Sequence, residues 1–179
     1  MKSLPFKTIV GMGVLILSTD MFAHARLRVA EADGSIPRLI TRDARDTNKG
    51  GTADAVPCGP QSTVRSQNPA VLVVGEEITV NYEETINHTG TYQLRFTEDQ
   101  VTWVDLAPSQ VDDDTAIVNN QANQYSFTFT VPDTPCTNCM IQFVQDMAGN
   151  NHYKSCADVI ITPAAAPPPA QPTGFTVTK

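Results

Sequence analysis

The sequence is poor in basic residues and in long apolar runs. It has 12 Lys and Arg against 19 Asp and Glu in 179 residues, a formal net charge of −7. Because phosphate backbones are bound by clustered cations, this balance argues against a nucleic-acid partner. The only long apolar run lies at the N-terminus, which excludes a polytopic membrane protein, and no later stretch keeps the apolar period of a helix. The length and the 41% of apolar residues suit one domain with its own core, or one domain and a tail.

The N-terminal run has the form of an export signal. Lys2 and Lys7 form a short basic region before an apolar stretch at 8–17, TIVGMGVLIL. Such a stretch has the length typical of a signal peptide and is too short to span a bilayer. We therefore expect this segment to be removed on export, which leaves a secreted or periplasmic protein without a membrane span.

Two cleavage positions are compatible with the residues that follow the apolar stretch. Cleavage after Ala25 has small residues at Ala23 and Ala25 and leaves Arg26 first; spacing alone slightly prefers it. Cleavage after Ala23 leaves His24 first. The choice matters because an N-terminal histidine offers two nitrogen donors to a metal.

Export permits the four cysteines to form disulfides. Three pairings are possible, and we favour Cys136–Cys139 with Cys58–Cys156. Cys136–Cys139 would close a tight turn between two strands, and Cys58–Cys156 would tie the early loops to the last strand. A redox or zinc role for the Cys-x-x-Cys pair is less favoured, because the chain has no second such pair and no surrounding βαβ pattern.

Strand patterns follow one another from about Pro69 onward. Apolar residues alternate with polar ones in most of them, and turn residues separate them. The stretches are 71–74, 78–82, 92–96, 125–131, 140–144 and 157–161. They predict an all-β fold, an immunoglobulin- or fibronectin-III-like antiparallel β-sandwich. Residues 30–69 lack the pattern and are expected to form a long N-terminal loop region that Cys58 holds near its end.

The C-terminal residues 163–179 begin with a Pro/Ala-rich stretch, PAAAPPPAQP. Such a stretch cannot lie inside a sheet and tends to the extended polyproline II conformation. We expect residues 163–179 to be a linker or tail beyond the folded domain.

Acidic residues occur in pairs and in one run. Glu76–Glu77 and Glu83–Glu84 are neighbours along strands, so their side chains face opposite ways and cannot flank one glycosidic bond, as a hydrolase requires. We expect these carboxylates to be edge or solvent charges. The run DDD at 112–114 is expected to be a solvated loop.

The chain has three histidines, His24, His88 and His152. If His24 is the first mature residue, its α-amine and imidazole can bind one metal together. His88 lies in a turn, NHTG, between two strands, where a side chain can project from one end of a sandwich. An amine and two imidazoles form a planar three-nitrogen site, the geometry that suits Cu(II).

Several stretches together resemble the bacterial lytic polysaccharide monooxygenase-like family, which includes the chitin-binding type-4 group and related copper histidine-brace proteins. The similarity spans about 24–162, and its middle and last stretches are the most specific. The stretches are HARL at 24–27, PCG at 57–59, GEEITVNYEETINHTGTYQLRF at 75–96, PCTNCMIQFVQ at 135–145 and NHYKSCADVI at 151–160.

The resemblance implies one mononuclear copper ion held by a histidine brace of His24 and His88. It therefore favours cleavage after Ala23. The implied organisation is a signal peptide over 1–23 and a copper-binding β-sandwich over 24–162.

The resemblance also implies roles for residues near the metal. Tyr153 falls on the axial side of the copper, where many relatives carry Phe. Gln145 falls at the place of a hydrogen-bond donor beside the metal. His152 is a possible accessory residue: neighbours in a strand face opposite sides, and if His152 faced the metal instead of Tyr153, the site would be a three-histidine carrier.

The function that the resemblance implies is that of a secreted copper-dependent polysaccharide monooxygenase. Such an oxidoreductase cleaves chitin, cellulose or a related polymer, using O₂ or H₂O₂ and an external electron donor. We expect a monomer. Two alternatives stay open: a periplasmic copper-binding carrier protein, because such carriers are also sandwiches with an N-terminal histidine, and a carbohydrate-binding module without a metal.

Overall fold

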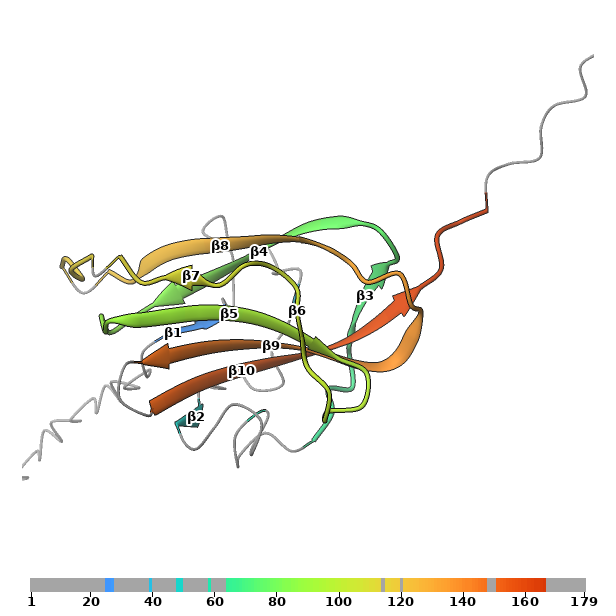
Figure 1. The fold of residues 1–179 in the computed structure, drawn as a ribbon, viewed down its shortest axis with the longest axis horizontal. Coiled ribbons are helices and arrows are strands. Elements are labelled where there is room, and N and C mark those ends of the chain that lie inside the picture. The colour runs from blue at the N-terminus through green and yellow to red at the C-terminus, as the bar shows by residue number, and fades with distance from the viewer. Residues whose placement is uncertain are drawn as a thin grey trace, which may run out of the picture.

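Ten β-strands and no helix make up the part of the chain that the computed structural model describes. This part comprises residues 25–27, 39, 48–49, 58, 64–113, 115–119, 121–147 and 151–166. The strands are β1 (Ala25–Leu27), β2 (Asn48–Lys49), β3 (Ala70–Val73), β4 (Glu77–Glu84), β5 (Gly90–Thr97), β6 (Val104–Asp105), β7 (Gln110–Val111), β8 (Asn123–Thr130), β9 (Cys136–Met147) and β10 (Asn151–Thr162). They form two sheets that face each other (Figure 1), which confirms the expected all-β sandwich.

The smaller sheet has the order β1–β4–β8, and both of its strand pairs are antiparallel. In β4 the even-numbered residues Ile78, Val80 and Tyr82 are buried, whereas the residues between them are exposed or half-buried. This is the two-residue period of a strand with one covered face. In β8, Phe127 and Phe129 lie opposite Val80 and Ile78 on the same inner face.

The larger sheet has the order β2–β10–β9–β5–β6, with β3 also beside β10 and β7 beside β5. All of its pairs are antiparallel except β3 with β10, which departs from the purely antiparallel sandwich expected. A hairpin imposes antiparallel pairing, but β3 and β10 are connected only through the rest of the domain. After β3 the chain turns at Gly75 (φ +73°), a conformation that glycine adopts without strain, and enters the other sheet as β4.

Five aromatic rings pack together in the core between the two sheets. They are Tyr82, Tyr92, Tyr125, Phe127 and Phe143. The ring of Tyr82 contacts all four others, with centroids 4.8 to 5.3 Å apart. Such ring pairs add about 1 kcal/mol each beyond the burial of apolar area. The rings come from both sheets, so their packing holds the sheets together.

Strands β9 and β10 are buried on both faces. On the inner face Phe143 joins the core, and on the outer face Met140 packs with the cysteines Cys58 and Cys156. A strand covered on both sides has no solvent-facing row of polar residues. This explains why the second half of β9 is buried at nearly every position instead of alternating.

Two disulfides join Cys58 to Cys156 and Cys136 to Cys139, the two bonds favoured from the sequence. The first ties the N-terminal region to β10. We expected the second to close a turn between two strands. It lies instead within the first residues of β9. Residues i and i+3 of a regular strand face opposite sides, but a shift in the β9–β10 register here lets both Cys136 and Cys139 pack against the core.

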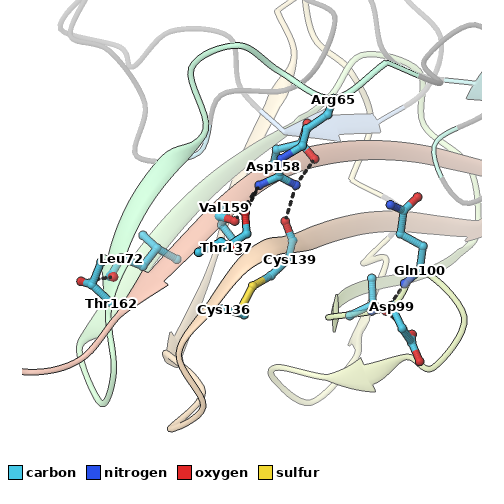
Figure 2. The surroundings of a disulfide bond; sticks show 11 residues. Arg65, Leu72, Asp99, Gln100, Cys136, Thr137, Cys139, Asp158, Val159 and Thr162 are labelled. Atoms are coloured by element: carbon cyan, nitrogen blue, oxygen red, sulfur yellow. Dashed lines mark hydrogen bonds and ion pairs between the residues drawn. A yellow bond between two sulfur atoms is a disulfide. The ribbon is translucent and has the colours of Figure 1, made fainter.

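Arg65 closes this irregular end of the larger sheet (Figure 2). Its guanidinium donates hydrogen bonds to the carbonyl oxygens of Thr137, Cys139 and Val159, over 3.0 to 3.2 Å. It also donates to the buried carboxylate of Asp158 over 3.0 Å. A bulge disrupts the ladder of backbone bonds, and a buried carbonyl without a donor is costly. Arg65 therefore supplies donors where the ladder is irregular.

The two ends of the chain are described only in part. The expected signal peptide over 1–23 and residues 167–179 lie outside the described residues. Within the expected long loop region, the described residues include the short strand β2, which pairs with β10, and Cys58. Residues 163–166 follow β10 as exposed chain without regular structure. No described residue lies in a helix that could cross a membrane.

Replacing Arg65 should test how much this clamp contributes to stability. Arg65→Ala takes the cation from a carboxylate that is 0% exposed, so we expect the free energy of unfolding to fall by about 3 kcal/mol. The free energy of unfolding of Arg65→Lys should lie between those of the wild type and Arg65→Ala, because an ammonium keeps the charge but cannot reproduce the planar set of donors. Urea unfolding at pH 7 measures both changes. A loss below about 0.5 kcal/mol for Arg65→Ala would mean that the contacts are those of an ordinary surface side chain.

Candidate functional site

His88 lies in the turn 85–89 that joins β4 to β5 at one end of the sandwich (Figure 1). The residue is half-buried, and its backbone N–H donates to Oε1 of Glu84, the last residue of β4, over 3.3 Å. At the other end of the turn, a Cβ on Gly90 would overlap the carbonyl oxygen of Asp146 in β9. Only glycine therefore lets β5 begin this close to β9. The turn is constrained on both sides of the imidazole.

Strand β1 begins at the same end of the sandwich. Its first residue, Ala25, pairs with Glu84 in antiparallel register, next to the point where β4 enters the His88 turn. A three-residue strand is too short to be recognised by periodicity, and the sequence did not predict it. His24 directly precedes β1 and lies outside the described residues. The expected pairing of His24 with His88 therefore stays a prediction.

The neighbours Glu83 and Glu84 face opposite ways, as expected, but only one is a solvent-side charge. Glu83 forms an ion pair with Arg26 of β1 over 2.7 Å on the outer face. Glu84 is fully buried, so the expectation that both are edge or solvent charges is wrong for it. The reason is parity, because Glu84 shares the even-numbered inner face of β4 with Val80 and Tyr82.

A buried polar cluster surrounds the Glu84 carboxyl. The Tyr92 hydroxyl lies 2.8 Å from both Glu84 Oε1 and Asp112 Oδ2. The Asn123 amide donates to Glu84 Oε2 over 3.2 Å and to the carbonyl of Thr115 over 2.7 Å. Since one hydroxyl has one proton, the Tyr92 oxygen can donate to one carboxyl and accept from the other when that one is protonated. The cluster joins β4, β5, β8 and the segment after β7.

The acidic run 112–114 is not a solvated loop throughout. Asp113 is exposed and accepts a hydrogen bond from the Tyr125 hydroxyl over 3.1 Å, whereas Asp114 lies outside the described residues. Asp112 is only 6% exposed. Its carboxylate contacts Tyr92, and these contacts replace the water that a loop carboxylate would bind, so the expectation is wrong for this residue.

The cluster shifts the acidity of its members. Burial raises the pKa of Glu84 from 4.5 to about 7; the hydrogen bond with the Asp112 carboxyl adds to the shift, and those from Tyr92 and Asn123 oppose it. Burial, together with the two carboxyls, also raises the pKa of Tyr92 well above its ordinary value. The Glu84 carboxyl therefore exchanges its proton near neutral pH.

Gln145 and Tyr153 lie side by side on the inner face at this end of the larger sheet. The register aligns Tyr92, Gln145 and Tyr153 across β5, β9 and β10. Tyr153 is buried, which raises the pKa of its hydroxyl, so the phenol is neutral at pH 7. Gln145 is fully buried, and neither polar atom of its amide has a hydrogen-bond partner among the described residues. Such an unsatisfied amide is rare and costly, and it suits contact with a ligand or with a group beyond those residues.

His152 lies on the opposite face of the sheet. It pairs with Asp146 in register, and its Nδ1 is 3.3 Å from Asp146 Oδ1. A shallow hollow of about 230 Å³, lined by Thr89, Gly90, Thr91 and Asp146, adjoins this pair. The structure thus brings Tyr153 and Gln145 to one face and leaves His152 on the other. This is the arrangement in which Tyr153, not His152, faces the interior.

The described residues do not hold a metal by themselves. Among them, no group of three His, Cys, Asp or Glu side chains is placed to bind one. They do supply the imidazole of His88 and the unsatisfied amide of Gln145 at the same end of the sandwich, and the imidazole of His152 lies on the other face of the sheet. Two further nitrogen donors from an N-terminal histidine would give, with the His88 imidazole, a set of three nitrogens that fits copper, whereas calcium and magnesium prefer oxygen ligands.

Sequence reasoning did not single out Glu84, Tyr92, Asp112 and Asn123 as a unit. Parity offered a signal for two of them, since Glu84 and Tyr92 follow the alternation of buried residues in their strands. No signal was present for Asp112, whose burial depends on a tertiary contact with Tyr92.

Comparisons with known proteins point to one family. The family model described as lytic polysaccharide mono-oxygenase, cellulose-degrading, matches residues 30–159. No curated protein matches the chain. Among solved structures, an AA10 lytic polysaccharide monooxygenase from Streptomyces lividans is 14% identical, with a TM-score of 0.41, over 59% of this chain and 64% of that one. A Jonesia denitrificans lytic polysaccharide monooxygenase, solved by neutron crystallography, is 16% identical, with a TM-score of 0.34, over 59% and 63%. The chain thus covers less than two thirds of the length of either.

The raised pKa of Glu84 predicts how stability depends on pH. The folded state holds the Glu84 proton more tightly than the unfolded state does. The contribution of Glu84 to the free energy of unfolding is therefore full below pH 4.5 and is lost as the pH rises through about 7. Urea unfolding of the metal-free protein should show the free energy of unfolding falling over this window, by up to about 3 kcal/mol. Glu84→Gln should lack that part of the slope, and Glu83→Gln should keep it. An identical pH profile for wild type and Glu84→Gln would contradict the assignment.

Proposed function

The chain belongs to the lytic polysaccharide monooxygenase family, and from this we propose that it is a secreted copper-dependent enzyme that cleaves a polysaccharide by oxidation. One observation carries the proposal beyond the family match. Ala25 lies opposite Glu84, at the end of the sandwich that bears His88. Because consecutive Cα atoms are about 3.8 Å apart, this register supports a site shared by His24 and His88.

The proposed copper site is a histidine brace. Its donors are the α-amine and imidazole of His24 and the imidazole of His88, three nitrogens that suit Cu(II). The amine is free only if residues 1–23 are removed, so the proposal includes a signal peptide that ends at Ala23. The chemistry that copper would supply when bound is the one-electron activation of O₂ or H₂O₂. This activation would lead to removal of hydrogen from a sugar C–H beside the glycosidic bond.

The other residues at this end orient and shield the site in the proposal. Tyr153 would line the copper site: it is a buried neutral phenol, which would provide an uncharged wall there. Gln145 offers a donor and an acceptor that no described residue uses, so it can hydrogen-bond a small ligand at an open position. His152 has no part in the brace, because it faces Asp146 on the other side of the sheet.

The proposed partners are a polysaccharide and an external electron donor. Chitin, cellulose and related polymers are the substrate class, and the electron donor would supply the electrons that such an oxidation with O₂ or H₂O₂ requires. Incubation of the processed, copper-loaded protein with a reductant and each polymer tests this directly. Oxidised oligosaccharides support the proposal. Tight Cu(II) binding without oxidised products would indicate a copper carrier, and retention on the polymer without copper binding would indicate a carbohydrate-binding module.

The first prediction from this proposal concerns the N-terminus of the exported protein. Intact mass should match a chain that begins with His24, and N-terminal sequencing should read His-Ala-Arg-Leu. A variant with one extra residue before His24 turns the amine into an amide, a much poorer copper ligand because it must first lose its proton. Its Cu(II) affinity should fall at least about 100-fold in calorimetric titration. A sequence that begins with Arg26, or unchanged affinity in the extended variant, would remove the amine from the site.

The second prediction concerns His88. His88→Ala should lower Cu(II) affinity by at least about 100-fold, because it deletes one of three ligands, while the circular dichroism spectrum and the melting temperature change little. His152→Ala is the matched control, since it deletes the other imidazole among the described residues. This control should bind Cu(II) as the wild type does. Lost affinity in His152→Ala with retained affinity in His88→Ala would favour the site on the other face.

A further inference from the structure

One connected cluster holds the His88 turn on both sides. On the β4 side, the His88 N–H donates to Glu84 Oε1 over 3.3 Å. On the β5 side, the Asp112 N–H donates to the carbonyl of Gly90 over 3.0 Å. Tyr92 links the two anchors, because its hydroxyl lies 2.8 Å from both carboxyls. The backbone on each side of the imidazole is therefore tied to the same buried group of side chains.

Glu84 is the member of this cluster that reaches the most segments. Its Oε1 contacts the turn and Tyr92 of β5, and its Oε2 accepts from Asn123 of β8 over 3.2 Å. Its backbone pairs with Ala25, the first residue of β1. The same residue thus adjoins the start of β1 and holds the backbone of His88.

A carboxyl group is a costly choice for this position. Glu84 is fully buried at an inner-face position of β4, where the residues before it in the same row are apolar. Core stability alone would favour an apolar side chain there, because burying a carboxylate carries a desolvation penalty. A fully hydrogen-bonded buried group does, however, select one arrangement of its partners. The contacts of Glu84 match that second role.

We propose that Glu84 is a positioning residue for His88. The Glu84 carboxyl fixes the turn relative to the start of β1, and it thereby sets the spacing between His24 and His88, the two residues of the brace. The inference rests on the proposed function for its consequence, since the spacing matters only if His24 and His88 share a metal. The hydrogen bond that carries it can be measured without copper.

Four variants of the processed full-length chain separate positioning from general stability. Glu84→Leu removes both acceptors, and Glu84→Gln keeps one oxygen that can accept the His88 N–H. Asn123→Ala breaks the other arm of the cluster and leaves the His88 bond. Glu83→Leu alters the outward-facing neighbour, which has no contact with the turn among those described above.

The first measurement is hydrogen exchange of the His88 amide in the metal-free protein, followed by NMR relative to amides of the core strands. Exchange should be about tenfold faster in Glu84→Leu and close to wild type in Glu84→Gln, Asn123→Ala and Glu83→Leu. Equal acceleration in Glu84→Leu and Asn123→Ala would show general loosening and would overturn the proposal. If Glu84→Leu does not fold, Tyr92→Phe is the substitute variant. It removes the hydroxyl that bonds Glu84 Oε1, the same oxygen that accepts the His88 N–H, whereas Asn123 bonds the other oxygen. The His88 amide of Tyr92→Phe should therefore also exchange faster than that of the wild type.

The second measurement is Cu(II) affinity, with the electron paramagnetic resonance spectrum of the bound ion. Glu84→Leu should bind about 10- to 100-fold more weakly, with altered hyperfine splitting, and Glu84→Gln should restore both. Normal affinity and spectrum in a folded Glu84→Leu whose His88 amide exchanges fast would overturn the positioning role. Absence of Cu(II) binding by the wild type would instead overturn the proposed function, and the exchange experiment would still decide whether Glu84 holds the turn.

Discussion

The register among β5, β9 and β10 is the constraint on which the candidate site depends. Side chains alternate along a strand, so one row carries Tyr92, Gln145 and Tyr153 inward while His152 and Asp146 of the next row face outward. A slip of one residue would exchange these sets and bring a histidine inside in place of a phenol. Buried residues on both faces of β9 and β10 prevent such a slip, so packing far from the site decides which chemistry its end of the sandwich can support.

Much of the fold could be predicted because its long strands are periodic. β4, β5 and β8 alternate visibly, and the unbroken run of β9 fits a strand covered on both faces. The strands that periodicity missed are two or three residues long, such as β1 and β7. Their existence depends on a partner strand, and the parallel pairing of β3 with β10 depends on the path of the whole chain. Neither is encoded in a local pattern.

The site was predictable to a different extent, residue by residue. His88 was recognisable as a turn residue between two strands, and the roles proposed for Gln145 and Tyr153 came from family resemblance alone. Glu84 could have been placed inside by counting from Tyr82, but its charge suggested solvent. The burial of Asp112 could not have been foreseen, because a run of three aspartates normally faces water and its burial depends on tertiary contacts, such as the one with the Tyr92 hydroxyl. Buried polar groups are thus the part of a site that local patterns describe least well.

The position of β10 has a mechanical consequence. The strand is flanked by β9 along nearly its whole length and by β3 along its last four residues, and the chain leaves it directly into the exposed residues 163–166. Tension applied beyond Ala166 would act along the strand axis. It would therefore load many backbone hydrogen bonds simultaneously in shear, whereas a hairpin pulled open would lose them one by one. In a domain anchored through this end, the load would enter β10 at the end where β3 and β9 both flank it, at the opposite end of the strand from Tyr153.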